Sequence, residues 1–238
     1  MARSHGSSLS LLQMIINGEI DNLLEKIEGV KVISDTGIPS KDDHTERELK
    51  TYLKNKGYGP DEIKSFYEWW PNSGPIWDFI CKAKLDGKEG LILLEAKSHK
   101  GETKEAKKSE PDSKKVVDFN KATTNHQRIE KNITSEFNEL NGAYKGYYQI
   151  ANRIAFASKA RKVLRQPVLL VILGFINDKS FDDYYSSCEE WQDDMKACLR
   201  TLQLDYLLDT NIDELTDKVG VRIISTPCHE DKRHVPQP

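Results

Sequence analysis

The sequence lacks the segments that mark a membrane protein or an exported one. Its longest uninterrupted apolar run, Val168–Ile176, has the length of a strand, whereas a membrane-spanning helix needs about 20 apolar residues. The opening residues MARSHGSSLSLLQMIING contain no hydrophobic stretch followed by a small-residue cleavage site, which predicts no signal peptide. We therefore expect a cytoplasmic protein that is not inserted in a membrane.

Cysteine is scarce, and its spacing excludes a structural zinc site. The four cysteines, Cys81, Cys188, Cys198 and Cys228, form no CxxC pair, and no Cys/His cluster has the spacing of zinc ligands. Reduced thiols in a reducing compartment are the simplest interpretation. The chain also has no Ser/His/Asp order typical of a nucleophilic hydrolase and no glycine-rich loop that would cradle phosphates.

The composition is that of a soluble globular protein, with 37% hydrophobic and 31% charged residues. A chain of 238 residues is long enough to bury a core without disulfides. We expect one domain over residues 1–226, with an N-terminal helical extension and a disordered tail at 227–238. The net charge is −3, but residues 151–166 hold five basic residues and no acid, which permits a polyanionic partner on one side.

Hydrophobic periodicity and turn residues predict alternating helices and strands. We expect helices over residues 9–27, 44–57, 119–140, 143–165 and 183–208, and strands over 30–33, 76–85, 91–97, 168–176 and 221–225. Asp86-Gly87 predicts a hairpin turn between the second and third of these strands. The lysine-rich residues 98–118 are expected to form a loop. This order indicates a mixed sheet with helices on both faces, an α/β domain.

Charged residues end two otherwise apolar strands. In LILLEAKS, alternation places Leu91, Leu93, Glu95 and Lys97 on one face. The preceding strand carries Asp78 in PIWDFIC, and the hairpin would bring it within reach of Glu95. Two carboxylates at adjacent strand ends suit an oxygen-preferring cation such as Mg²⁺. Such an ion can activate water for attack on a phosphodiester, with the lysine orienting that water or stabilising developing charge.

These residues resemble the signature of the PD-(D/E)xK nuclease superfamily, which includes restriction endonucleases and repair nucleases. The resemblance implies a restriction-endonuclease-like αβββαβ core, whose second and third strands are here those at 91–97 and 168–176. The helices predicted between these two strands would be an insertion. It also implies that Asp78, Glu95 and the Ala96 carbonyl bind Mg²⁺, which Mn²⁺ could replace, and that Lys97 is catalytic. The chain departs from the pattern at Trp77, since no proline directly precedes Asp78.

The bare (D/E)xK pattern is not specific, because the chain contains it at eight other positions, beginning at Glu48, Glu62, Asp86, Glu102, Glu105, Asp112, Asp194 and Glu230. Only the copy at Glu95 follows an apolar strand and has an acid on the strand before it. A surface hairpin with an incidental Glu–Lys pair is the competing interpretation. It accounts for the alternation but not for three charges converging at strand ends.

Further candidate residues come from two helices. Glu46 shares a predicted helix face with Leu49 and is either a further metal ligand, as in the resembled family, or an acid favoured by a helix N-terminus. Gln149 and Arg153, four residues apart, lie in the apolar stripe of the 143–165 helix. Gln149 resembles a catalytic residue of exonuclease-like members of the family, whereas a buried polar pair bonding the backbone is the alternative.

Basic residues are the candidates for contact with nucleic acid. These are Arg153, Lys159, Lys162 and Arg165 on the 143–165 helix and Lys100 in the lysine-rich loop, although lysine-rich faces are often only solvated. The aromatic cluster at residues 66–70 could stack bases or fill a core. The resemblance implies a Mg²⁺- or Mn²⁺-dependent deoxyribonuclease, in defence against foreign DNA or in DNA processing. It leaves open a homodimer, other subunits of a defence system, and a catalytically silent binding module.

Overall fold

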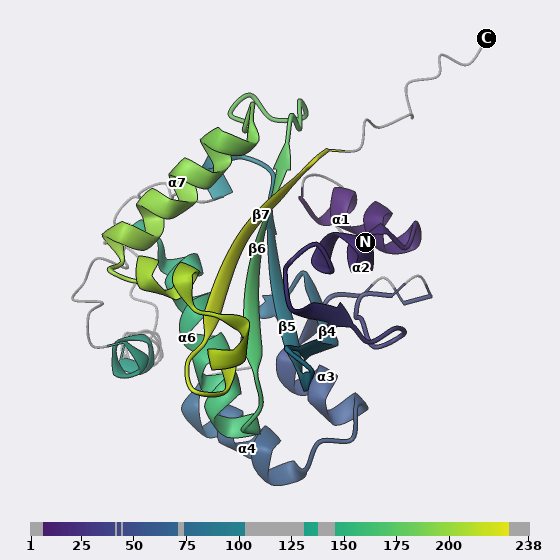
Figure 1. Cartoon of the computed structure of the whole chain (residues 1–238), viewed down its shortest axis with the longest axis vertical. Coiled ribbons are helices and arrows are strands. Elements are labelled where there is room, and N and C mark those ends of the chain that lie inside the picture. The colour runs from purple at the N-terminus through teal and green to yellow at the C-terminus, as the bar shows by residue number, and fades with distance from the viewer. Residues whose placement is uncertain are drawn as a thin grey trace, which may run out of the picture.

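The most apolar segments of the chain form a five-stranded sheet in the computed structural model, which describes residues 7–40, 42–43, 45–70, 74–102, 131–137 and 146–228 (Figure 1). The strands are β1 (Val30–Val32), β4 (Phe79–Leu85), β5 (Lys88–Lys97), β6 (Val168–Ile176) and β7 (Gly220–Pro227), in the spatial order β1-β4-β5-β6-β7. The pairs from β1 to β5 are antiparallel and the pairs from β5 to β7 are parallel. The predicted mixed sheet is confirmed.

The hairpin turn is formed by the two residues that the sequence indicates. Leu85 pairs with Lys88 across the turn, and the central residues Asp86 and Gly87 have φ values of 49° and 78°. Two consecutive positive φ angles match the twist of a two-residue hairpin loop, and Asp-Gly tolerates them well. This turn fixes the register of β4 against β5 and therefore the pairing of every residue toward the far end of the hairpin.

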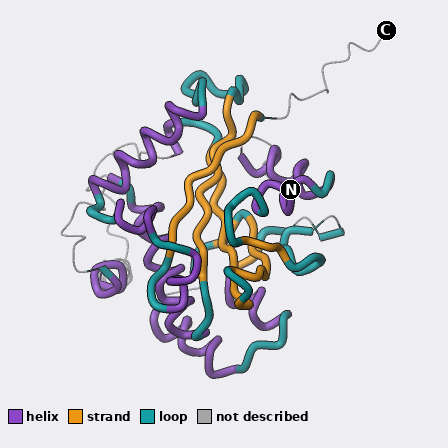
Figure 2. Tube along the Cα trace, viewed as in Figure 1, coloured by secondary structure: helices purple, strands orange, loops and turns teal. Residues whose placement is uncertain are grey.

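Helices cover both faces of the sheet, as the sequence predicts (Figure 2). One face carries α1 (Ser7–Ile16), α2 (Glu19–Leu24) and the short η4 (Ile212–Thr216), and the other carries α3 (Leu49–Asn55), α4 (Pro60–Trp69), α6 (Tyr148–Leu164) and α7 (Cys188–Thr201). The remaining short helices are η1 (Lys100–Glu102) and η3 (Asp205–Asp209), and residues 131–136 are also helical. No helix in the described part of the chain is long and apolar enough to cross a membrane.

Several predicted elements differ in extent. The helix predicted over 9–27 is two helices, α1 and α2, separated at Gly18, whose φ is +70°. The helix predicted from residue 44 begins at Leu49, and Gly57 with φ +79° follows its end, as expected of a helix stop. The helix predicted over 183–208 is shorter, because the chain enters it only at Ser187, whose side chain caps the first turn.

The strand predicted over residues 76–85 is interrupted at Asp78, and this difference affects the site. Residues Ile76–Trp77 form β3, which pairs with β2 (Arg47–Glu48) in a separate two-stranded sheet. The chain bends at Asp78 before β4 begins at Phe79. Asp78 therefore lies at the junction of two sheets rather than within one strand.

The helices predicted between the strands at 91–97 and 168–176 are present in the described residues 131–136 and 148–164. β5 and β6 are parallel, and parallel neighbours require a long crossover connection. The α6 helix lies in that connection and packs against β6. Most of residues 98–140 and all of 229–238 lie outside the described residues, so the expected loop, most of the first predicted helix and most of the predicted tail are not described.

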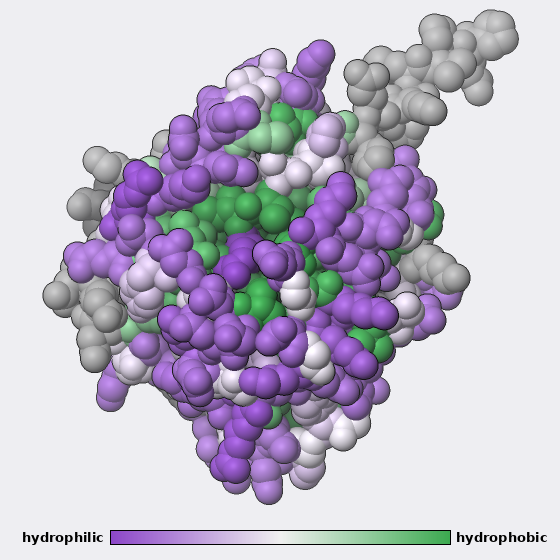
Figure 3. All heavy atoms as spheres, in the orientation of Figure 1, coloured by the Kyte–Doolittle hydropathy of each residue, from purple (hydrophilic) through white to green (hydrophobic). Residues whose placement is uncertain are grey.

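The two faces of β5 line different cores. Leu91 and Leu93 belong to the core under α3, α4, α6 and α7, whereas Ile92 and Leu94 belong to the core under α1 and α2. The predicted alternation is therefore confirmed, and it sets the direction of Glu95. Figure 3 shows apolar residues over the middle of one face, where β7 forms the sheet edge, framed by polar residues.

Gly174 in β6 offers a test of packing between the sheet and α7. A Cβ atom added at this position would lie 2.5 Å from ring atoms of Trp191, whose side chain is fully buried and whose Nε1 donates to the Ile224 carbonyl at 2.9 Å. We expect Gly174→Ala to lower the free energy of unfolding by about 1–3 kcal/mol, the usual effect of overpacking. Urea unfolding measures this. Gly146→Ala, where a Cβ meets nothing within 4 Å, is the control and should change little; equal stability of both variants would contradict the close packing.

Candidate functional site

Asp78 and Glu95 lie opposite each other at the open end of the β4–β5 hairpin. Phe79 pairs with Leu94, so the next position along the antiparallel register sets Asp78 beside Glu95. The Asp78 Oδ2 atom accepts a hydrogen bond from the backbone N–H of Ala96 at 2.7 Å. The hairpin thus brings together the two carboxylates that the sequence singles out.

Glu95 is a buried carboxylate with three side-chain donors. Its Oε1 accepts from Lys97 Nζ at 2.6 Å and from Gln149 Nε2 at 2.8 Å, and its Oε2 accepts from Arg153 Nε at 2.6 Å. The side chains of Glu95 and Lys97 are 2% and 4% exposed. Removing charges from water is costly unless they are paired and hydrogen bonded, so these donors are what allow Glu95 to remain charged inside the protein.

Arg153 links Glu95 to the two-stranded sheet. Its Nη2 donates to the Ile76 carbonyl at 3.1 Å, and its guanidinium lies over the Trp77 ring at 5.2 Å from the centroid. The sequence left open whether Gln149 and Arg153 face the site or bond the backbone. Gln149 donates to the Glu95 carboxylate, and Arg153 donates both to that carboxylate and to a backbone carbonyl. The sequence did not predict that Arg153 pairs with Glu95. A basic residue in the apolar stripe of a helix was the feature that could have indicated a buried acidic partner.

The two carboxylates have opposite pKa shifts. Burial, followed by the negative charge of Glu95, raises the pKa of Asp78 to about 8, against the opposing effects of Lys97 and of the Ala96 N–H. Burial would also raise the pKa of Glu95, but the positive charges of Lys97 and Arg153 outweigh it and lower that pKa. Near neutral pH the pair therefore carries one firmly ionised carboxylate and one that holds a proton in the metal-free protein.

Glu46 lies next to this pair but not on a helix. It directly precedes β2, and the register Arg47↔Trp77 places it beside Asp78. After burial and Glu95, its charge is a further cause of the raised pKa of Asp78. The helical position expected for Glu46 is wrong, because α3 starts three residues later, at Leu49. A second strand, rather than a helix face, brings it to the site.

The metal ligands suggested by the sequence are Asp78, Glu95, Glu46 and the Ala96 carbonyl. Among the residues that the structure describes, no three His, Cys, Asp or Glu side chains are arranged to hold a metal ion. A carboxylate offers about four lone-pair positions. The hydrogen bonds given above occupy three of them on Glu95 and one on Asp78, which leaves oxygen positions of the kind that Mg²⁺ prefers.

The candidate nucleic-acid contacts are dispersed and several are already paired. Arg153 is 8% exposed and faces Glu95. Lys162 forms an ion pair with Glu136 at 2.5 Å, and Lys100 forms one with Glu190. Lys159 lies over the Trp69 ring, 5.5 Å from its centroid, and Arg165 is exposed at the end of α6 with φ 52°. Of these five cations, Arg153 pairs with one of the two carboxylates, whereas Lys100 and Lys162 pair with other acids.

The aromatic residues at 66–70 fill a core. Phe66 and Trp70 are 2% and 4% exposed, and both pack against Phe156 of α6, with ring centroids 5.5 and 5.6 Å apart. This supports the core alternative over base stacking for these two residues. None of the four cysteines, all of which lie in the described residues, forms a disulfide. Comparisons of the chain with protein-family models, with curated proteins and with solved structures find no match.

The raised pKa of Asp78 predicts a specific pH dependence of stability. The folded protein holds the Asp78 proton up to about pH 8, whereas the unfolded chain releases it near its ordinary value of 3.8. Wild-type stability relative to Asp78→Asn should therefore fall as pH rises through this interval, and level off above it. Urea unfolding in EDTA across this pH range measures the difference. A constant difference would show that Asp78 has an ordinary pKa.

The ion pair between Glu95 and Arg153 predicts strong coupling between the two residues. Removing Glu95 relieves repulsion between clustered carboxylates, but its loss leaves two buried cations without their partner. We expect Glu95→Gln and Arg153→Met each to lower the free energy of unfolding by about 3–5 kcal/mol, and the double variant to lose clearly less than the sum. A double-mutant cycle by urea unfolding tests this, and additive losses would contradict the pairing.

Proposed function

We propose that the protein is a metal-dependent phosphodiesterase that cleaves DNA, in defence against foreign DNA or in DNA processing. The observation that carries the proposal is the convergence of Asp78 and Glu95 at one end of the hairpin, with Lys97 two residues beyond Glu95. A buried ion pair with a second, partly buried carboxyl group beside it is costly for folding. A site that needs two acids and a cation for chemistry accounts for that cost.

The connectivity of the sheet supports the resemblance to PD-(D/E)xK nucleases. The order helix, strand, strand, strand, helix, strand runs through α1–α2, β1, β4, β5, α6 and β6. These four strands are also spatial neighbours in that order. The segment with α3, α4, β2 and β3 is then inserted between the first and second strands, and β7 adds to the sheet edge. In this arrangement the crossover helix α6 is part of the core, and it brings Gln149 to Glu95.

The residues at the hairpin end fit Mg²⁺ in their chemistry. Asp78, Glu95 and the Ala96 carbonyl would hold the ion, with Glu46 close enough to assist. When bound, the ion supplies positive charge that polarises a phosphodiester and lowers the pKa of a coordinated water. Mn²⁺ would be held by the same oxygen ligands. A cation beside Asp78 also favours the ionised form of that carboxylate, against the burial that raises its pKa.

The chain's own residues would prepare the reaction. Lys97 donates to Glu95 at 2.6 Å in this structure, and its ammonium can turn toward an attacking water or the developing charge on a phosphate. Gln149 and Arg153 hold Glu95 from the helix side, so its carboxylate keeps one orientation when Lys97 moves. This division assigns catalysis to Lys97 and positioning to Gln149 and Arg153.

A binding module without catalytic activity is the second candidate function. The tight pairing of Lys97 and Arg153 with Glu95 favours it, because a structural ion-pair cluster would look the same. The two functions differ in what Asp78 does. A structural cluster has no use for a second, half-buried carboxylate whose pKa is raised by burial and then by its neighbour, whereas a metal site requires one.

Replacement of Lys97 tests the proposed activity. We expect Lys97→Ala to reduce Mg²⁺-dependent cleavage of DNA by about 10²–10³-fold or more, the effect of losing one charge-stabilising donor, without loss of metal binding. The measurement is cleavage of plasmid, linear and single-stranded DNA, and of RNA, with Mg²⁺, Mn²⁺ or EDTA. Lys84→Ala, which removes an exposed lysine of β4, is the matched control. Activity that persists in EDTA, or wild-type turnover by Lys97→Ala, would contradict the mechanism.

A further inference from the structure

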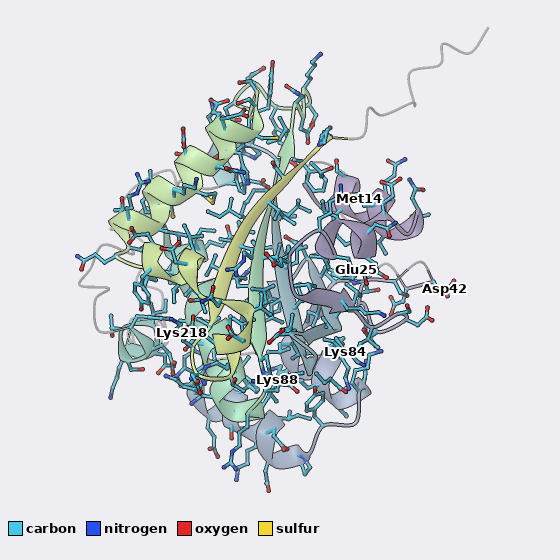
Figure 4. All side chains as sticks on the ribbon, viewed as in Figure 1. Met14, Glu25, Asp42, Lys84, Lys88 and Lys218 are labelled. Atoms are coloured by element: carbon cyan, nitrogen blue, oxygen red, sulfur yellow. The ribbon has the colours of Figure 1, made fainter. Side chains whose placement is uncertain are left out.

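A polar pocket lies beside the C-terminal half of α6. Its volume is about 230 Å³. Its walls come from α6, the helical residues 131–136, η3 and the segment that leads into β7, and they include Glu136, Arg161, Lys162, Tyr206, Asp217 and Lys218. Figure 4 shows Lys218 at the side of the molecule where the 131–136 helix lies. None of these residues belongs to the cluster around Glu95.

Arg161 lines this pocket, and one of its buried donor atoms is unpaired among the described residues. Its Nη1 donates to the Thr216 carbonyl at 2.6 Å, which fixes the guanidinium. Its Nε is buried and has no hydrogen-bond partner among the residues that the structure describes. A buried charged donor without an acceptor is costly. The planar guanidinium is a group that proteins use to bind carboxylate and phosphate, and the Arg161 side chain lines this pocket.

The neighbouring charges leave the pocket receptive to an anion. Glu136 is already compensated, since it accepts from Lys162 Nζ at 2.5 Å and from Ser158 Oγ at 3.1 Å. Lys218, which is 46% exposed, pairs with Glu214 outside the pocket lining at 3.2 Å. In the described part of the chain, no carboxylate forms an ion pair with Arg161. Asp217 is the remaining acid of the wall, and it can accept hydrogen bonds from amino groups.

We infer that this pocket binds the phosphate of a nucleotide, with its base against Tyr206. Arg161, anchored through its Nη1, and Lys218 would supply positive charge to the phosphate, while Tyr206, a residue that is 46% exposed, would present its ring to a base. The nucleotide is either a link of a nucleic-acid strand or a free mononucleotide. The strand source rests on the proposed function, whereas the free nucleotide does not.

The position of the pocket suits a strand that also reaches the candidate site. Arg161 follows Arg153 by eight residues on the same helix, which is about 12 Å along its axis at a rise of 1.5 Å per residue. That span corresponds to roughly three to four nucleotides of B-form DNA at 3.4 Å each. At about 100° per residue, Arg161 is turned by roughly 80° around the helix axis from Arg153, so the strand would turn partly around α6 between them.

Binding in EDTA tests this inference without measuring cleavage. The probes are inorganic phosphate, deoxyadenosine monophosphate and a short single-stranded oligodeoxynucleotide, titrated calorimetrically into the full chain. We expect Arg161→Gln and Lys218→Gln each to weaken binding of a nucleotide probe about tenfold or more, since each loses a charge-assisted hydrogen bond. Lys64→Gln, which removes a 71% exposed lysine of α4, is the matched control and should bind like wild type.

The arms of the experiment separate the outcomes. Binding of the oligonucleotide but not of the mononucleotide identifies a strand, and comparable binding of both identifies a free nucleotide. Binding of inorganic phosphate alone, no binding of any probe, or equal affinity of wild type and both variants would overturn the inference. If Arg161→Gln lowers the Tm, its weaker binding has no clear cause. The binding measured with Lys218→Gln then tests the inference, because replacing an exposed side chain leaves the fold intact. If the protein binds nucleotides in this pocket but cleaves no nucleic acid, the proposed nuclease activity is contradicted and the inference about the pocket is supported.

Discussion

The buried charge of Glu95 is the constraint on which the arrangement of the site depends. A carboxylate at 2% exposure must be compensated from within the protein. Three side chains do so, from two elements far apart in the sequence: Lys97 from the same strand, and Gln149 and Arg153 from the crossover helix. The position of α6 on the sheet and the identity of its inward residues are therefore tied to one acid on β5.

The same pairing explains why Asp78 behaves differently from its neighbour. The cations are directed at Glu95, so Asp78 receives one backbone N–H and faces an ionised carboxylate. Its pKa is raised while that of Glu95 is lowered. Two acids with opposed shifts in one cluster are characteristic of sites that bind a cation or transfer a proton. This asymmetry links the electrostatics of the fold to the proposed chemistry.

Arg153 also connects the site to a structural irregularity. The bend at Asp78 ends β3, and Arg153 donates to the Ile76 carbonyl just before it. Because β3 pairs with β2, the chain preceding α3 is held close to Asp78, and Glu46 comes with it. The interruption of the predicted strand is thus what places a third acid near the first two. A continuous strand over 76–85 would have continued the main sheet instead.

The sequence by itself determined the hairpin, its turn and the facing of Asp78, Glu95 and Lys97, because strand alternation and an Asp-Gly turn are local properties of the chain. It also placed Gln149 and Arg153 on the inward stripe of their helix, since helical periodicity is local as well. Only the tertiary structure decided that Arg153 pairs with Glu95, that Glu46 arrives from a second strand, and that Arg161 meets Lys218 in a pocket. These contacts join residues far apart in the chain, and their geometry follows from how whole elements pack rather than from any local pattern.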